Sequence, residues 1–250
     1  MPLLGERSMG FAASLSLAEP PLVADALEML VGQRIFLGHQ SLGAEILEGV
    51  QTVTGGLLAL REGRSPEQFL SPGLVHTALG TQGTPDAMLA EFEGVLAAVG
   101  GRVDFALFEF FSLDFDVRSD VDRLFADYLA TMARLRAKYP AVFFVHLTVP
   151  LTVEPRNGRS YAVHAPGGVP ENEGRNRFNM LLRTSRETHP LFDLAAHEST
   201  HADGTVCTFD YGGIRFPALA SEYAAGGQHL NAEGRNSLAE ALLIYLARLL

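Results

Sequence analysis

The sequence contains one cysteine, no tryptophan and no long apolar run, and these shortages exclude several classes of protein. Because Cys207 is the only cysteine, no internal disulfide and no multi-cysteine zinc site can form. No histidine or helix start stands beside Cys207, so we interpret it as a small buried residue rather than a catalytic thiol. No stretch of about 18 consecutive apolar residues is present, so we expect no membrane span.

Positive charge is scarce, with 19 lysines and arginines against 29 aspartates and glutamates and a net charge of −10. The basic residues form no patch, and the densest group, at 134–138, closes a predicted helix, where cations complement the helix dipole. A protein with this balance is not attracted to nucleic acid or to anionic lipid, so neither is expected as a partner. The number of subunits is not encoded in these patterns.

The first 20 residues are apolar but also poor in positive charge. Arg7 is the single basic residue there, and no long apolar core follows it, so the segment does not match a secretory signal. Both a cytoplasmic and an exported location stay open. We expect residues 1–32 to form an N-terminal extension with a helix, and residues 33–250 to form a single domain.

Short apolar runs alternate with longer amphipathic segments along the chain. The runs at 34–37, 103–111, 141–149 and 191–195 predict buried strands. Helical spacing predicts helices at 43–50, 85–99, 119–139, 171–188 and 232–249, with Ser119 as the N-cap of the third. Residues 52–83 and 198–228 have little periodicity, and 150–170 is rich in proline and glycine, which is typical of a loop. The alternation predicts an α/β three-layer sandwich with a central parallel sheet.

A serine follows the first predicted strand, in Phe36-Leu37-Gly38-His39-Gln40-Ser41-Leu42-Gly43. In parallel sheets the ligand site lies at the carboxyl ends of the strands, so Ser41 stands where a nucleophile could act beside free helix amides. Serine is also a favoured N-cap, and this segment alone favours that simpler reading. His39, two residues earlier, could line a site or contact a substrate.

A histidine stands just before the last predicted helix, in Gly226-Gly227-Gln228-His229-Leu230-Asn231-Ala232-Glu233-Gly234-Arg235. A histidine in such a glycine-rich turn can serve as a general base, although alone it would more often be an ordinary loop residue. Asn231 offers a structural explanation for part of the block, since asparagine is a favoured N-cap.

Together the two blocks resemble those of the SGNH (GDSL-like) hydrolases, from about residue 33 onward. That family has its nucleophilic serine after the first strand and its histidine in an Asp-x-x-His element before the last helix. Gly38-His39-Gln40-Ser41 stands where the family has Gly-Asp-Ser, and Gln228 to Gly234 resembles the final block. The resemblance implies a flavodoxin-like SGNH hydrolase fold.

The resemblance also implies a serine esterase without a metal or other cofactor, acting on a carbohydrate ester or another small-molecule ester. Ser41 would attack and carry a short acyl group such as acetyl, and His229 would take the proton. The amides of Ser41 and Gly83 would form the oxyanion hole, with Gly80 as an alternative to Gly83. His39, Gln40 and Asp114 are expected to contact the substrate.

Two positions depart from the family pattern. Gly226 replaces the aspartate three residues before His229, so the orienting acid must come from elsewhere or from a backbone carbonyl. Candidate acids are Asp203, Asp210 and Glu222. The run Phe111-Ser112-Leu113-Asp114 also lacks the family's oxyanion-hole asparagine. A degenerate site with a carbohydrate-binding or scaffolding role is therefore the alternative, and O-acyl transfer is a third.

The remaining histidines favour structural roles. His146 lies inside an apolar run, which predicts a core histidine with a hydrogen-bond partner. His197 and His201 are four residues apart, a spacing that binds metal on a helix, but their serine-, threonine- and glycine-rich surroundings favour a loop. No metal site is expected.

Overall fold

The computed structural model describes residues 22–80, 83–115, 119–153 and 171–250, and its centre is a six-stranded parallel sheet. The strands lie in the order β2-β3-β1-β4-β5-β6. Their bounds are Arg34–His39 (β1), Leu60–Glu62 (β2), Gly73–Ala78 (β3), Phe105–Phe108 (β4), Phe143–Leu147 (β5) and Leu191–Phe192 (β6). From β1 the chain continues through β2 and β3 on one side of β1, and it then crosses to β4 on the other side. The order in which strands are added to the sheet therefore reverses at β1.

The strands are apolar because both faces of the sheet are covered. Successive side chains of a strand point to opposite faces, so Phe36 enters one core while Ile35 and Leu37 enter the other. Phe36 pairs with Val75 of β3 and with Ala106 of β4, which puts β1 in the middle of the sheet.

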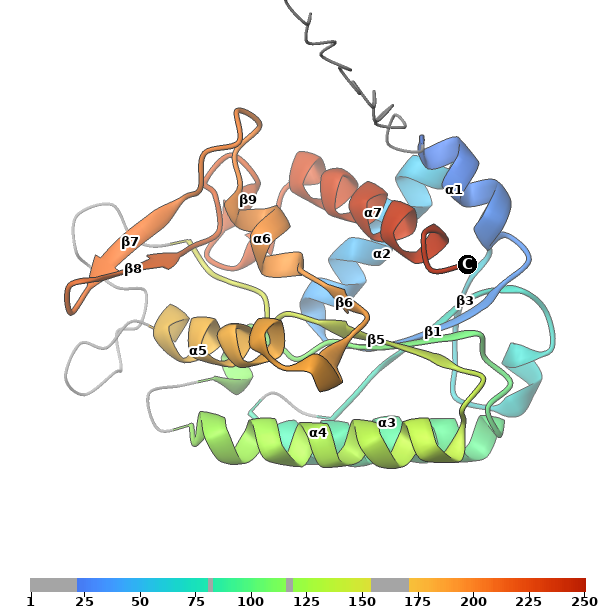
Figure 1. Ribbon diagram of the computed structural model, residues 1–250. Helices are drawn as coiled ribbons and strands as arrows, with labels where there is room; N and C mark the ends of the chain where they lie inside the picture. The colour runs from blue at the N-terminus through green and yellow to red at the C-terminus, as the bar shows by residue number, and fades with distance from the viewer. Residues whose placement is uncertain (1–21, 81–82, 116–118, 154–170) are drawn as a thin grey trace, which may run out of the picture.

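Helices form a layer on each face, and Figure 1 shows the two layers above and below the sheet. The first layer holds α1 (Val23–Leu30), α2 (Ser41–Thr54), α7 (Ala232–Ala247) and the short α6 (Leu194–Ser199). The second holds α3 (Pro85–Val99), α4 (Val121–Lys138) and α5 (Glu171–Thr184). The predicted α/β three-layer sandwich is confirmed.

The helices α2 and α7 pack closely against each other, although they are far apart in sequence. Gly49 permits the approach, since a Cβ atom at this position would lie 2.2 Å from the carbonyl oxygen of Arg235. Asn231 caps α7 by accepting a hydrogen bond from the amide of Gly234 at 2.9 Å. This packing brings the start of α2 and the segment before α7 to the same region of the molecule.

Several predicted boundaries were wrong. The region 52–83 contains β2, β3 and a 3₁₀ turn, η1 (Pro66–Phe69), rather than irregular chain. Asp120, not Ser119, caps α4 through the amide of Arg123. The strand predicted at 191–195 stops at Phe192, because Asp193 accepts from the amide of Ala196 and starts α6.

The region 198–228, predicted to be irregular, carries short antiparallel pairs. One is β7 (Thr208–Tyr211) with β8 (Ile214–Pro217), and the other is β9 (Ala224–Gly226) with β10 (His229–Leu230). Two further 3₁₀ turns, η2 (Ser112–Asp114) and η3 (Arg186–Thr188), complete the elements described.

The N-terminal extension falls outside the described residues up to residue 21, and α1 follows it. Ala26, Leu27 and Leu30 of α1 belong to the same core as α2 and α7. In the part of the chain that the structure describes, no helix has the length and apolar character needed to cross a bilayer.

Candidate active site

Ser41 lies just after the carboxyl end of β1, the central strand, at the point where the order of the strands reverses. It is the first residue of α2 and is half-buried. Gln40, with an extended backbone, occupies the N-cap position, so the reading of Ser41 as a simple N-cap was wrong. Gly43 lets the turn close tightly, because a Cβ atom there would lie 2.3 Å from the Cβ atom of His39. Ser41 therefore stands at the carboxyl end of a parallel strand, where ligands of such sheets bind.

The carboxylate of Glu45 holds His229. Oε1 of Glu45 lies 2.6 Å from Nδ1 of His229, and Oε2 accepts the amide of Leu230 at 2.6 Å. The Glu45 side chain is 14% exposed and that of His229 is 55% exposed. One mostly buried carboxylate therefore fixes both the imidazole and the backbone beside it, which leaves Nε2 as the ring nitrogen available for proton transfer.

Ser41 and Glu45 lie one helical turn apart on α2. Residues with this spacing share a face of a helix, with Cβ atoms roughly 5–6 Å apart. Ser41 and His229 are both described, and no direct hydrogen bond joins their side chains; Glu45 is what connects them. The structure thus brings Ser41, Glu45 and His229 to the same region, with Ser41 and Glu45 on one face of α2 and Glu45 bonded to His229.

The carboxylate that bonds His229 is therefore Glu45, which the sequence analysis missed. The three carboxylates suggested there are engaged elsewhere. Asp203 accepts from the Thr205 amide and hydroxyl, Asp210 faces Arg215, and Glu222 pairs with His201 at 3.0 Å. The sequence did place Glu45 four residues after Ser41 in a predicted helix, and hence on the same helix face, but it did not indicate the contact with His229.

Glu109 lies beneath the turn that carries Ser41, directly after β4. Its Oε2 accepts the amide of Gln40 at 2.8 Å and that of Gly43 at 3.3 Å. The side chain is completely buried, and Oε1 has no hydrogen-bond partner. Burial raises the pKa of Glu109 to about 8. Among the first amides of α2 in the described chain, those of Ser41 and Leu42 have no acceptor, so they remain for a ligand.

The glycine amides expected in an oxyanion hole are bound to carboxylates. The amide of Gly80 donates to Oε2 of Glu91 at 2.9 Å, and that of Gly83 donates to Oδ1 of Asp114 at 3.0 Å. Gly83 is thus not free for an oxyanion in this arrangement, and neither is Gly80.

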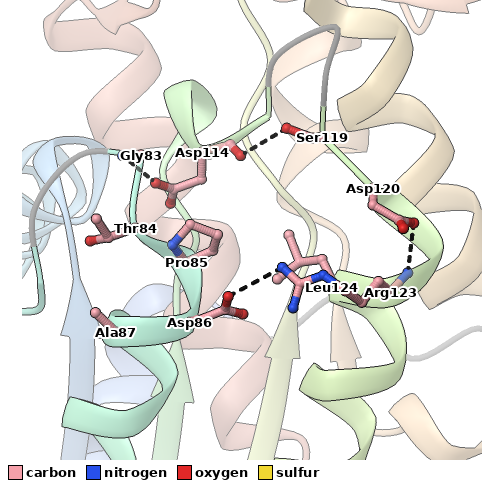
Figure 2. Close-up of a pocket in the computed structure, with 10 residues that line it drawn as sticks. All are labelled: Gly83, Thr84, Pro85, Asp86, Ala87, Asp114, Ser119, Asp120, Arg123 and Leu124. Atoms are coloured by element: carbon pink, nitrogen blue, oxygen red, sulfur yellow. Dashed lines mark hydrogen bonds and ion pairs between the residues drawn. The ribbon is translucent and has the colours of Figure 1, made fainter.

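Asp114 lines a cavity of about 620 Å³ between the starts of α3 and α4 (Figure 2). Its second oxygen accepts the amide of Phe111 at 2.9 Å, and burial raises its pKa to about 6. Arg123 reaches across the cavity to Asp86, as the dashed line in Figure 2 shows. Gly83 and Asp114 follow β3 and β4, the two neighbours of β1, so this cavity lies at the same edge of the sheet as Ser41.

His39 and Gln40 point into the protein rather than toward an open surface. His39 is 4% exposed, and its ring contacts the carbonyl of Gln40 at 2.7 Å and Nδ1 of His76 at 3.1 Å. Burial lowers the pKa of His39, which favours the neutral ring. The Gln40 carboxamide donates to the carbonyls of Leu79 and Gly80. In this arrangement both residues support the loops around Ser41 instead of presenting their polar atoms to a substrate.

A buried network ties the His229 segment to the sheet. The Ser112 hydroxyl donates to Oε1 of Gln228 at 2.7 Å, and the Ser112 carbonyl accepts from Nε of Arg175 at 2.7 Å. Arg175 is fully buried on α5. Gln228, the residue before His229, is therefore fixed to η2, the turn that follows β4.

The other histidines serve local contacts. His146 bonds the Tyr128 hydroxyl at 2.6 Å in the core, as predicted. His197 lies on α6, not in a loop, and stacks on Phe192, while His201 pairs with Glu222. Over the ranges that the structure describes, no three histidine, cysteine, aspartate or glutamate side chains gather as metal ligands.

Solved structures resemble this architecture at low sequence identity. A protein from Streptococcus pneumonia, provisionally assigned as a platelet activating factor, matches with a TM-score of 0.53 and 18% identity, over 90% of each chain. A protein from Desulfitobacterium hafniense DCB-2, provisionally assigned as a lipolytic member of the G-D-S-L family, matches with a TM-score of 0.50 and 8% identity, over 87% of this chain and 99% of its own.

No protein-family model and no curated protein matches the sequence. The structural matches establish the fold, which is that of the SGNH hydrolases.

Proposed function

We propose that the chain is a serine esterase that removes a short acyl group, such as acetyl, from a carbohydrate or another small ester. Ser41 is the nucleophile, His229 is the base, and Glu45 orients His229. The observation that carries the proposal is the 2.6 Å contact between Glu45 and Nδ1 of His229, one helical turn from Ser41. It supplies the acid whose absence from the His229 block spoke against catalysis.

The reaction uses protein groups alone. Oγ of Ser41 attacks the ester carbonyl carbon while Nε2 of His229 takes the hydroxyl proton. The carbon–oxygen bond to the alcohol breaks, and the alcohol leaves with the proton from His229. Water then attacks the acyl-enzyme, releasing the carboxylic acid and restoring Ser41. The amides of Ser41 and Leu42 are the best available donors to the oxyanion.

A binding protein on the same fold is the second candidate. The observation that favours it is the occupation of the Gly80 and Gly83 amides by Glu91 and Asp114, since an oxyanion hole with fewer donors is weaker. Such a protein would bind a carbohydrate without turning over any acyl ester. O-Acyl transfer is distinguished from hydrolysis by a sugar acceptor that competes with water for the acyl-enzyme.

Hydrolysis of p-nitrophenyl acetate and labelling of Ser41 by a serine-directed phosphonate test the proposal. The wild-type chain is expected to do both, whereas Ser41→Ala and His229→Ala are expected to reduce hydrolysis to background. A serine elsewhere on the surface, such as Ser221, is the control, and Ser221→Ala is expected to hydrolyse like the wild type. Equal hydrolysis by Ser41→Ala, or no labelling of the wild type, would refute the assignment and favour the binding protein.

A further inference from the structure

Glu109 is a buried acid that the proposed reaction does not use. It follows β4, is completely buried, and accepts the Gln40 and Gly43 amides on one oxygen while the other has no partner. A buried carboxylate with an unpartnered oxygen is costly, so its presence calls for a role.

Glu109 bonds the backbone on both sides of Ser41. Gln40 and Gly43 stand on either side of Ser41, and both amides converge on the same carboxyl oxygen. A Cβ atom at Gly43 would come within 3.0 Å of that oxygen and would also collide with His39. The turn is therefore tightly packed, and the Glu109 carboxyl group lies against it.

Burial disfavours the charged form of Glu109 more strongly than the hydrogen bonds from the Gln40 and Gly43 amides favour it, so the pKa is raised. The charged groups that act on it are the carboxylates of Asp114 on η2 and Glu45 on α2, and it acts in turn on the buried Glu198 of α6. His39 of β1, which faces the same glycine, has a lowered pKa because it is buried, so it does not bring a compensating cation. Arg175 of α5 lies beyond Ser112, whose carbonyl it bonds. The uncharged carboxyl group is thus the form that suits this position near neutral pH.

We propose that Glu109 is a positioning residue whose uncharged carboxyl group holds the Gln40–Gly43 turn, and whose ionisation slows attack by Ser41. A negative charge beneath the start of α2 opposes the negative charge that develops on the oxyanion, which the same helix terminus must stabilise. The effect on attack rests on the proposed esterase function. The expected change of the Gln40–Gly43 turn with pH does not depend on that function.

The first test is independent of catalysis. In the full-length chain, the backbone amide resonances of Gln40 and Gly43 are followed by NMR between pH 6 and 10. Both are expected to shift with a midpoint near 8 in the wild type and to stay constant in Glu109→Gln, because glutamine mimics the uncharged acid. A flat wild-type response, or a shift that persists in Glu109→Gln, would overturn the proposal.

The second test follows kcat/KM for p-nitrophenyl acetate over the same range, with each variant normalised to its value at pH 7 and Ser41→Ala subtracted as background. Ionisation with a pKa of about 8 predicts a wild-type rate about tenfold lower at pH 9 than at pH 7, and Glu109→Gln is expected to lose this decline. At pH 7, Glu109→Ala is expected to be slower than Glu109→Gln, because alanine leaves both amides without an acceptor.

Glu198→Gln is the matched control, since Glu198 is also fully buried with one unpartnered oxygen but bonds Leu151 instead of the α2 turn. It is expected to keep the alkaline decline. A decline that survives in Glu109→Gln, or that vanishes in Glu198→Gln as well, would overturn the positioning role while leaving the esterase intact. A wild type that shows the amide titration but hydrolyses no ester would refute the esterase and support Glu109 as the group that holds the turn.

Discussion

Replacing Glu45 by glutamine tests the central feature of the site. Glutamine keeps the size of the side chain and can still accept the Leu230 amide, but it removes the negative charge beside His229. In the proposed reaction that charge, 2.6 Å from Nδ1, would stabilise the imidazolium formed when Ser41 attacks. We therefore expect Glu45→Gln to slow acylation without unfolding the protein.

The magnitude follows from the exposure of the two groups. Opposite charges about 4 Å apart interact by about 1 kcal/mol in water and by about 4 kcal/mol at an effective dielectric constant of about 20. Glu45 is 14% exposed and His229 is 55% exposed, so solvent screening places the pair between these limits. The corresponding loss in rate is roughly fivefold to a thousandfold.

The assay is steady-state hydrolysis of p-nitrophenyl acetate, together with the rate of Ser41 labelling by a phosphonate. Glu48→Gln is the control, because Glu48 lies on the same helix and also pairs with a residue at the start of α7, Arg235. It is exposed, and its loss is expected to change the rate less than twofold. The reasoning fails if Glu45→Gln stays within twofold of the wild type, or if Glu48→Gln is equally slow.

Three further predictions concern stability, measured by urea unfolding. Gly49→Ala is expected to destabilise the protein by roughly 1–3 kcal/mol, because its Cβ atom would meet the Arg235 carbonyl at 2.2 Å; an unchanged unfolding midpoint would contradict the close packing of α2 on α7. Asn231→Ala removes the cap of α7 and is expected to cost about 1 kcal/mol, whereas Asn231→Asp, which can still cap, should cost less. Burial raises the pKa of Glu198 well above its ordinary value, so the folded state binds its proton more tightly than the unfolded state. Wild-type stability should thus fall relative to Glu198→Gln as the pH rises above about 4.3, and a constant difference would refute this.

Helical spacing predicted most of the helices, but α6 lay in a stretch predicted as a strand and a loop. The stripe from Met88 to Val99 gave α3 its observed extent, 85–99. Strand β3 was missed because its short run includes His76 and Thr77, which are polar although β3 pairs with the central strand. Only Leu74 and Val75 form an apolar run in β3, which is too short to stand out, whereas β5 continues through apolar residues on both sides of His146.

Some residues of the candidate site could be predicted from the sequence, but their contacts could not. The resemblance to the SGNH hydrolases pointed to Ser41 and His229, and the structure places one at the start of α2 and the other just before α7. The contact of Glu45 with His229 joins residues 184 positions apart, and no local pattern encodes such a pairing. The partners of Gly83 were equally hidden, because its bond to Asp114 depends on how the loops after β3 and β4 fold.

The double contact of Glu45 has a consequence for motion. In an Asp-x-x-His element the acid travels with the base, so a loop that swings away keeps that pair together. Here Glu45 belongs to α2, the helix that starts at Ser41, and the same carboxylate binds both the ring of His229 and the amide of Leu230. Withdrawal of the segment would therefore break both bonds at once and separate His229 from Glu45.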